Sequence, residues 1–93
     1  CIILSLKNGN NGLVVLYDTN QKAFILRGID GKENKVNVVI PSNRTDYLCF
    51  CVVQTATERT FYVYKFSTDE TFKDVVNASP IGTFTQIYCY SKL

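Results

Sequence analysis

The chain has 93 residues, of which 46% are hydrophobic and 19% are charged, and its formal net charge is +2. This length and composition indicate a single folded domain over residues 1–93 and argue against disorder. The basic residues are scattered, so the chain lacks the basic patch of a nucleic-acid-binding protein, and no apolar run approaches the roughly 20 residues that span a membrane.

Seven short apolar or alternating runs, separated by turn residues, predict an antiparallel all-β fold. The Asn-Gly cluster at residues 8–12 and the Asp30-Gly31 dipeptide are hairpin signals, because Asn, Asp and Gly tolerate positive φ. Pro41 ends the fourth run, because proline cannot donate to a central ladder. The predicted strands are residues 1–6, 13–17, 23–29, 35–40, 47–56, 59–66 and 83–90.

Two of these runs are apolar on both faces. Residues 47–56 are nearly all apolar, which predicts the most deeply buried strand. In residues 59–66, a Phe and Val row alternates with a Tyr row, so both faces of this strand are also apolar. Such a strand lies between two packed layers, lines a pocket, or leaves one row of side chains for a partner.

One short helix is predicted near the C-terminal end. The Ser-Thr-Asp-Glu segment at residues 67–70 supplies a capping hydroxyl and two carboxylates that suit the positive end of a helix dipole. Phe72, Val75 and Val76 then recur at helical spacing, and Pro80 closes the segment.

The residue types that commonly perform catalysis are poorly represented. There is no histidine, which removes the commonest general base and any Ser-His or Cys-His pair. The glycines fall in predicted turns and do not form a phosphate-binding loop. We therefore expect no catalytic residue, no metal site and no cofactor, and a binding protein rather than an enzyme.

Four cysteines without a Cys-x-x-Cys pair indicate disulfides in an oxidising compartment rather than a zinc site. Asn43 and Asn77 each begin a glycosylation sequon, which also points to a secreted or extracellular protein. Cys49 and Cys51 lie two apart in a predicted strand, so their side chains share one face and are poorly placed to bond each other. Either one of them bonds a cysteine of a missing segment or partner chain, or they are small buried hydrophobic residues.

Several segments resemble the lipocalin family. The Cys-Ile pair at residues 1–2, followed by the Asn-Gly turn and apolar run of residues 11–17, is similar to the second and third lipocalin strands. The Thr-Asp-Tyr triplet at residues 45–47 looks like the second conserved lipocalin motif, and residues 88–93 are similar to the cysteine-bearing tail of some members. The first-strand Gly-x-Trp motif is absent, so the resemblance is to a shortened lipocalin or to a fragment that another chain completes.

This resemblance implies a meander of antiparallel strands closed into a barrel that carries or sequesters a small apolar ligand. It also implies a disulfide between Cys1 and Cys89, because some lipocalins join the Cys-Ile strand to the tail in this way. The candidate ligand-binding residues that it implies are Leu16, Phe24, Leu26, Val38, Phe50, Val52, Tyr62, Tyr64 and Tyr88.

Two other interpretations of the same strands stay open. An immunoglobulin-like or other β-sandwich module would bind a protein partner through a sheet face or edge. A protease inhibitor would instead present an exposed loop such as residues 8–12.

Overall fold

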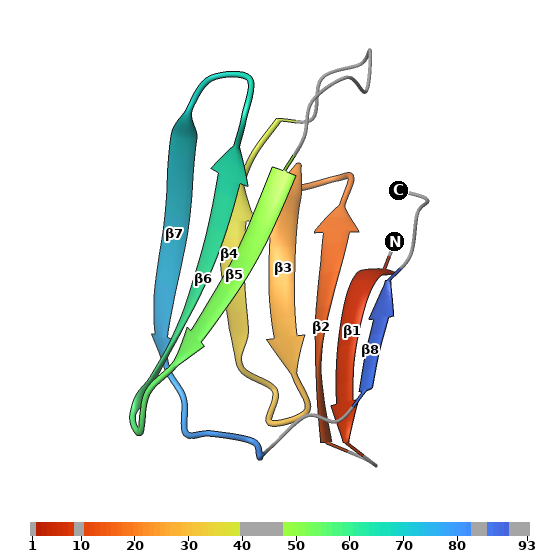
Figure 1. Cartoon of the computed structure of the whole chain (residues 1–93), viewed down its shortest axis with the longest axis vertical. Helices are drawn as coiled ribbons and strands as arrows, with labels where there is room; N and C mark the ends of the chain where they lie inside the picture. The colour runs from red at the N-terminus through yellow and green to blue at the C-terminus, as the bar shows by residue number, and fades with distance from the viewer. Residues whose placement is uncertain (1, 9–10, 40–47, 83–85, 90–93) are drawn as a thin grey trace.

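The computed structural model of this protein describes residues 2–8, 11–39, 48–82 and 86–89. In these residues every regular element is a β-strand, and the strands form two antiparallel sheets (Figure 1). The prediction of an antiparallel all-β fold is therefore confirmed. The strands are β1 (Ile2–Asn8), β2 (Asn11–Asp18), β3 (Ala23–Gly28), β4 (Glu33–Asn37), β5 (Leu48–Gln54), β6 (Glu58–Lys65), β7 (Glu70–Asn77) and β8 (Gln86–Cys89).

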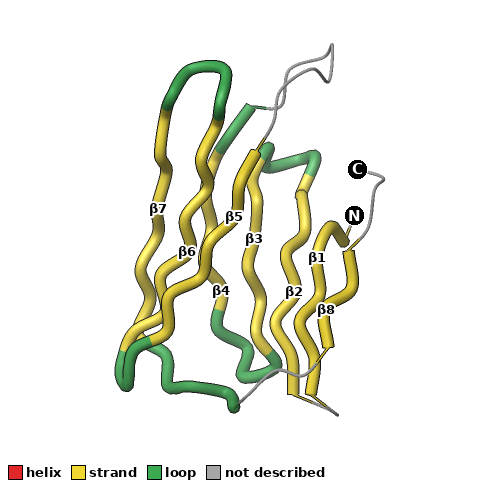
Figure 2. Tube along the Cα trace, in the orientation of Figure 1, coloured by secondary structure: helices red, strands yellow, loops and turns green. Residues whose placement is uncertain are grey.

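The two sheets are stacked as a sandwich and are not closed into a barrel (Figure 1, Figure 2). The larger sheet has the strand order β4-β3-β2-β1-β8, and the smaller one has the order β5-β6-β7. Both are built from consecutive hairpins, and β8 then returns to the larger sheet and pairs with β1. The strand order also differs from the ABED and CFG sheets of an immunoglobulin domain.

Local turn chemistry explains the hairpins of the larger sheet. Between β2 and β3, the carboxylate of Asp18 accepts hydrogen bonds from the backbone N–H groups of Asn20 and Gln21, at 2.9 and 3.1 Å. Between β3 and β4, Asp30 accepts one from the backbone N–H of Lys32, and Gly31 has a φ of 81°, where a side chain would be strained. The predicted Asp-Gly hairpin is confirmed.

The hydrophobic core lies between the sheets. Phe24 of β3 packs edge-on against Tyr17 of β2 and Phe50 of β5, with ring centroids 4.9 and 5.1 Å apart. Phe50 in turn stacks on Phe61 of β6, so a continuous row of rings joins the two layers. The buried core side chains are Leu13, Val15, Tyr17, Phe24, Leu26, Val36, Val38, Phe61 and Val63.

One side of the sandwich is tied by polar contacts between β4 and the smaller sheet. The side-chain Nδ2 of the buried Asn34 donates hydrogen bonds to the backbone carbonyls of Arg59 and Asp74, both at 2.9 Å. The carboxylate of Asp74 in β7 accepts a hydrogen bond from the backbone N–H of Lys35 at 3.0 Å. β4 is therefore held against β6 and β7.

The predicted C-terminal helix is wrong, because its segment forms strand β7 and pairs with β6 along its whole length. Phe72 and Val76 are four residues apart, a spacing that places them on one face of either a helix or a strand. The half-buried Phe72 and Val76 alternate with exposed Thr71 and Val75, as in a strand. The β-branched residues of this segment favour an extended chain, and the hydrogen bonds from β6 complete it.

The prediction that residues 47–56 form the most buried strand is also wrong. β5 lies at the edge of the smaller sheet, and among the described strands it pairs with β6 alone. Its inward side chains, such as Phe50 and Val52, are half-buried, whereas Cys49, Cys51 and Val53 are exposed. A continuous apolar run does not distinguish a central strand from an edge strand, because the number of strands beside it is decided elsewhere in the chain.

Candidate binding cleft

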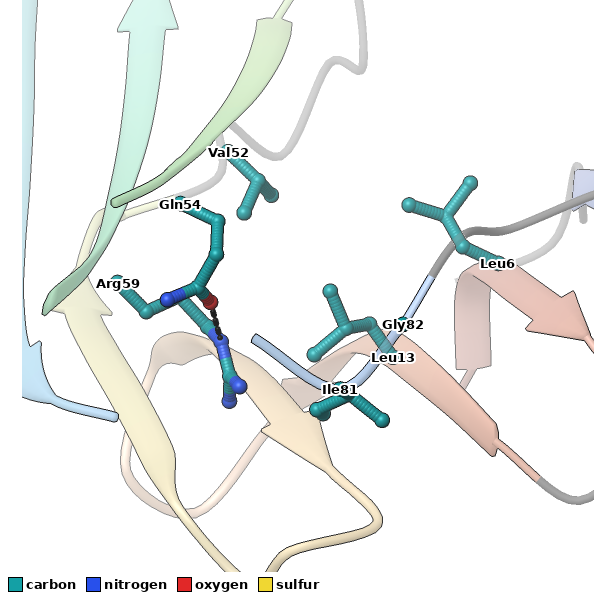
Figure 3. Close-up of a pocket in the computed structure, with 7 residues that line it drawn as sticks. All are labelled: Leu6, Leu13, Val52, Gln54, Arg59, Ile81 and Gly82. Atoms are coloured by element: carbon teal, nitrogen blue, oxygen red, sulfur yellow. Dashed lines mark hydrogen bonds between the residues drawn. The ribbon is translucent and has the colours of Figure 1, made fainter. Parts of the chain in front are cut away.

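An apolar cleft opens between β5 and the inner face of the larger sheet. It consists of two adjoining cavities with volumes of about 340 and 180 Å³ that share Leu6, Leu13 and Val52. Figure 3 shows these side chains around a common space, with Gln54 and Arg59 at one end of it. The other lining residues are Leu4, Val15, Leu26, Phe50, Ile81 and Gly82.

The cleft exists because three strands face five. The smaller sheet is held over the β4 side of the larger sheet, while β1 and β8 lie beyond the free edge of β5 (Figure 1). Leu4 and Leu6 of β1 therefore point inward but are only half-buried, unlike Leu13 and Val15 of β2. Among the described residues, part of the apolar surface on the inner face of the larger sheet is thus left without a covering strand.

The polar end of the cleft is built around a fully buried arginine. The guanidinium of Arg59 donates hydrogen bonds to both carboxylate oxygens of Asp30, at 3.1 and 3.4 Å, to the backbone carbonyl of Ser79 at 3.2 Å and to Oε1 of Gln54 at 2.8 Å. The Nε2 of Gln54 donates in turn to the backbone carbonyl of Ala78 at 2.8 Å. This network satisfies the buried charge, as an interior arginine requires.

The Asp30 carboxylate neutralises Arg59. Burial raises the pKa of the Asp30 carboxyl, but hydrogen bonds from the Arg59 guanidinium and from the Lys32 backbone N–H lower this pKa more, so it lies below its ordinary value. Asp30 is therefore ionised at neutral pH, and the ion pair leaves no net charge at this end of the cleft. An occupant of the cleft has no need to supply a counter-charge.

Gly28 makes room for this network at the end of β3. A Cβ atom at position 28 would lie 2.5 Å from Oδ1 of Asp30, 2.8 Å from a guanidinium nitrogen of Arg59 and 2.9 Å from Cδ1 of Ile81. These distances are shorter than van der Waals contact, so a side chain here would displace the ion pair or Ile81.

β5 is the unprotected edge among the strand edges that the structure describes. It has seven residues without charge, proline or bulge, and its outward side chains are Cys49, Cys51 and Val53. Natural sheets block such edges with charged residues, short strands or covering groups. Each of the other described edges has one of these protections. β4 and β7 carry charged residues and meet through Asp74, and β8 is short, with four residues.

The structure divides the candidate ligand-binding residues among several places. Leu26, Phe50 and Val52 line the cleft, and Phe24 and Val38 are buried in the core beside it. The remaining three described side chains are not in the cleft, as Leu16 alternates with the inward Val15 and the half-buried Tyr62 and Tyr64 alternate with the inward Phe61 and Val63. The side chain of Tyr88 lies outside the described residues.

The tyrosines of β6 belong to the outer face of the smaller sheet. The hydroxyl of Tyr64 donates a hydrogen bond to the carboxylate of Asp69, which raises the pKa of Tyr64. Phe66 packs edge-on against the same ring, with centroids 4.7 Å apart. The alternation of two apolar rows in this strand is confirmed, and the tyrosine row faces away from the core.

The predicted modification and disulfide residues are only partly described. Cys1 and Asn43 lie outside the described residues, and Cys89 is described only through its backbone, which pairs with that of Leu4. Asn77 ends β7 and is exposed. Among the described side chains the cysteines are Cys49 and Cys51, and both have free thiols.

Sequence reasoning missed the polar end of the cleft, although a signal for it was present. Arg59 has the same strand parity as the buried Phe61 and Val63, so it points to the core with them. Gln54 precedes the turn into β6 and lies on the inward face of β5. The Asp30 partner could not be found in this way, because it lies in the turn between β3 and β4 of the other sheet.

Comparison of this chain with family models, curated proteins and solved structures found no match. The described residues contain no helix long and apolar enough to cross a membrane, and no group of three or more His, Cys, Asp or Glu side chains placed to hold a metal ion.

Proposed function

We propose that this protein is a non-enzymatic binding module that accepts an extended segment of another polypeptide along the edge of β5. The observation that carries the proposal is that the unprotected edge strand also forms one wall of the apolar cleft. The predicted secreted or extracellular location belongs to the same proposal.

Strand addition uses both features at once. The free edge of β5 offers backbone N–H and C=O groups over seven residues, and these supply affinity without regard to sequence. Alternate side chains of the added strand would point into the cleft, where Leu6, Leu13 and Val52 would contact them. Because the Arg59–Asp30 pair leaves that end neutral, the inward residues of the partner are apolar and uncharged.

The added element is a single strand and not the β5 edge of a second copy. Antiparallel pairing of two β5 strands needs a two-fold axis perpendicular to the sheet, which places the larger sheets of both copies in one layer. In each copy β1 and β8 extend past the edge of β5 (Figure 1), so these strands would overlap. An isolated extended segment leaves this layer undisturbed.

Amide hydrogen exchange of the reduced protein tests the proposal. The probe is a short peptide with valine at alternate positions and threonine between them, which should slow exchange in β5 and leave β7, the opposite edge of the same sheet, unchanged. A peptide of the same composition with its valines grouped serves as control. Absence of protection in β5, or equal protection by both peptides, would contradict strand addition.

A small apolar ligand is the second candidate occupant. The larger cavity, at about 340 Å³, falls within the size range of small-molecule sites, which are likewise mainly apolar with few polar groups. Among the described side chains, the buried polar atoms without a partner are Ser5 Oγ and Asn34 Oδ1, and neither residue lines the cleft. Such a ligand would therefore be held by burial of apolar surface.

Native mass spectrometry of gently purified protein separates the two candidates. A retained small molecule that the alternating peptide cannot displace favours a carrier. An empty protein that binds no apolar fluorescent probe, yet shows peptide protection in β5, excludes the carrier.

A further inference from the structure

The outward face of β5 carries two exposed thiols that the proposed function does not use. Cys49 and Cys51 are free, and in the ladder with β6 they lie opposite Tyr64 and Tyr62. They flank Phe50, whose side chain points the other way and lines the cleft. Exposed free thiols are unusual in a chain whose cysteine usage predicts an oxidising compartment.

These two thiols have no suitable partner within the smaller sheet. Residues two apart in a strand are separated by about 7 Å and their side chains point in parallel, which does not suit a disulfide. On the β6 side, the positions opposite both cysteines are occupied by tyrosines. The remaining cross-strand positions are those of a strand added at the free edge of β5.

We infer that β5 forms a disulfide with the strand that it accepts, through Cys51 or Cys49 and a cysteine at an outward position of the partner. This inference rests on the proposed function. Residues directly opposite each other in antiparallel strands have Cα atoms about 4.5–5.5 Å apart, and disulfides need about 4.4–6.8 Å. The outward cysteine of the partner is flanked by two inward residues, so its recognition segment reads apolar-Cys-apolar.

The bond forms by thiol–disulfide exchange when the partner cysteine arrives as a mixed disulfide with glutathione. The thiolate of Cys51 or Cys49 attacks the partner sulfur, the new S–S bond forms and the old one breaks. The glutathione thiolate leaves and takes up the proton that the attacking cysteine lost. One disulfide is exchanged for another, so no further oxidant is required.

Capture of a peptide probe tests the inference. The probe is the alternating peptide with one cysteine at a central outward position, added as its glutathione mixed disulfide, and the control has the same composition with its valines grouped. Binding beside β5 raises the effective concentration of the disulfide, so we expect capture about 10²-fold faster for the alternating peptide. Peptide mass analysis should locate the bond on Cys51 or Cys49, and concentrated urea should abolish the difference.

Equal capture rates for the two peptides in the folded protein would overturn the inference. The variants Cys49→Ser and Cys51→Ser, each checked for its folded spectrum, should separate the two thiols, with one variant keeping the full rate. If both variants keep the difference in rate between the two peptides, the bond forms elsewhere, and this result would also overturn the inference. The cysteine-free peptide distinguishes failure of the disulfide inference from failure of the proposed function. Protection of β5 without selective capture contradicts only the inference, whereas absence of protection contradicts the proposed function itself.

Discussion

At the scale of single residues, the buried pair between Arg59 and Asp30 controls the polar end of the cleft. The side chain of Arg59 is fully buried, so removing its carboxylate partner leaves an uncompensated charge. We expect Asp30→Ala to lower the free energy of unfolding by about 2 kcal/mol, less than for a wholly buried pair because Asp30 is 29% exposed. Denaturation by urea measures this change.

The surface pair between Arg27 and Glu33 is the matched control. Both side chains are about half-exposed, and such pairs contribute less than about 1 kcal/mol. Glu33→Ala should therefore leave the free energy of unfolding nearly unchanged. Equal effects of the two substitutions would show that the cleft pair is no different from a surface pair.

The lowered pKa of Asp30 makes the stabilisation by its ion pair with Arg59 depend on pH. Because the folded-state pKa lies below 3.8, the ordinary value, folding favours the ionised carboxylate. The stabilisation is complete above the unfolded-state pKa and is lost as pH falls through the folded-state pKa. The difference in stability between the natural protein and Asp30→Asn should thus be constant from neutral pH to about 5 and shrink in more acidic solution. A difference that grows on acidification would contradict this sign.

Gly28 is predicted to act through the same network. Gly28→Ala places a methyl group against Asp30, Arg59 and Ile81, and overpacking of this kind costs about 1–3 kcal/mol. If the cost arises from the ion pair, it should be smaller in a protein that already carries Asp30→Ala, and a double-mutant cycle measures this coupling. Additive effects would assign the cost of Gly28→Ala to Ile81 or to the backbone instead.

At the scale of elements, two valines of the smaller sheet provide a matched pair. Val53 of β5 and Val75 of β7 lie on either side of Thr60, and they are 44% and 43% exposed. Val53→Lys should weaken binding of the alternating peptide by about 1 kcal/mol, because it replaces the cross-strand contact between Val53 and an outward threonine of the peptide with a charge. Val75→Lys, at the opposite edge, should leave peptide binding unchanged, and titration calorimetry compares them. Equal weakening would place the peptide elsewhere.

The elements that could be predicted from the sequence are those that depend on neighbouring residues. The hairpin at Asp30-Gly31 follows from local backbone preferences. The two faces of β6 follow from the alternation of its Phe and Val residues with its Tyr residues. β7 could not be assigned from Phe72, Val75 and Val76 alone, because hydrogen bonds from β6 decided between strand and helix. The exposure of β5 and the partner of Arg59 depend on how the sheets pack, and a local sequence pattern does not determine this packing.

At the scale of the whole molecule, the unequal sheets are the source of the cleft and of the free edge. The β4 side is tied by Asn34 and Asp74, so the sheets are held together there, whereas among the described strands β5 pairs only with β6. The described strands form two separate sheets, so the barrel that the lipocalin resemblance implies is not confirmed. The resemblance itself stays a prediction, because the comparisons found no match that would test it.

Residue-resolved amide exchange of the free protein, followed by NMR, tests the open edge of β5 most directly. In an antiparallel edge strand, alternate amides point to the neighbour and to solvent. We predict slow and fast exchange in alternation along Leu48–Gln54, and slow exchange throughout the centre of Glu58–Lys65, which has strands on both sides. Uniformly slow exchange along β5 would mean that both of its edges are already paired, and would contradict the account.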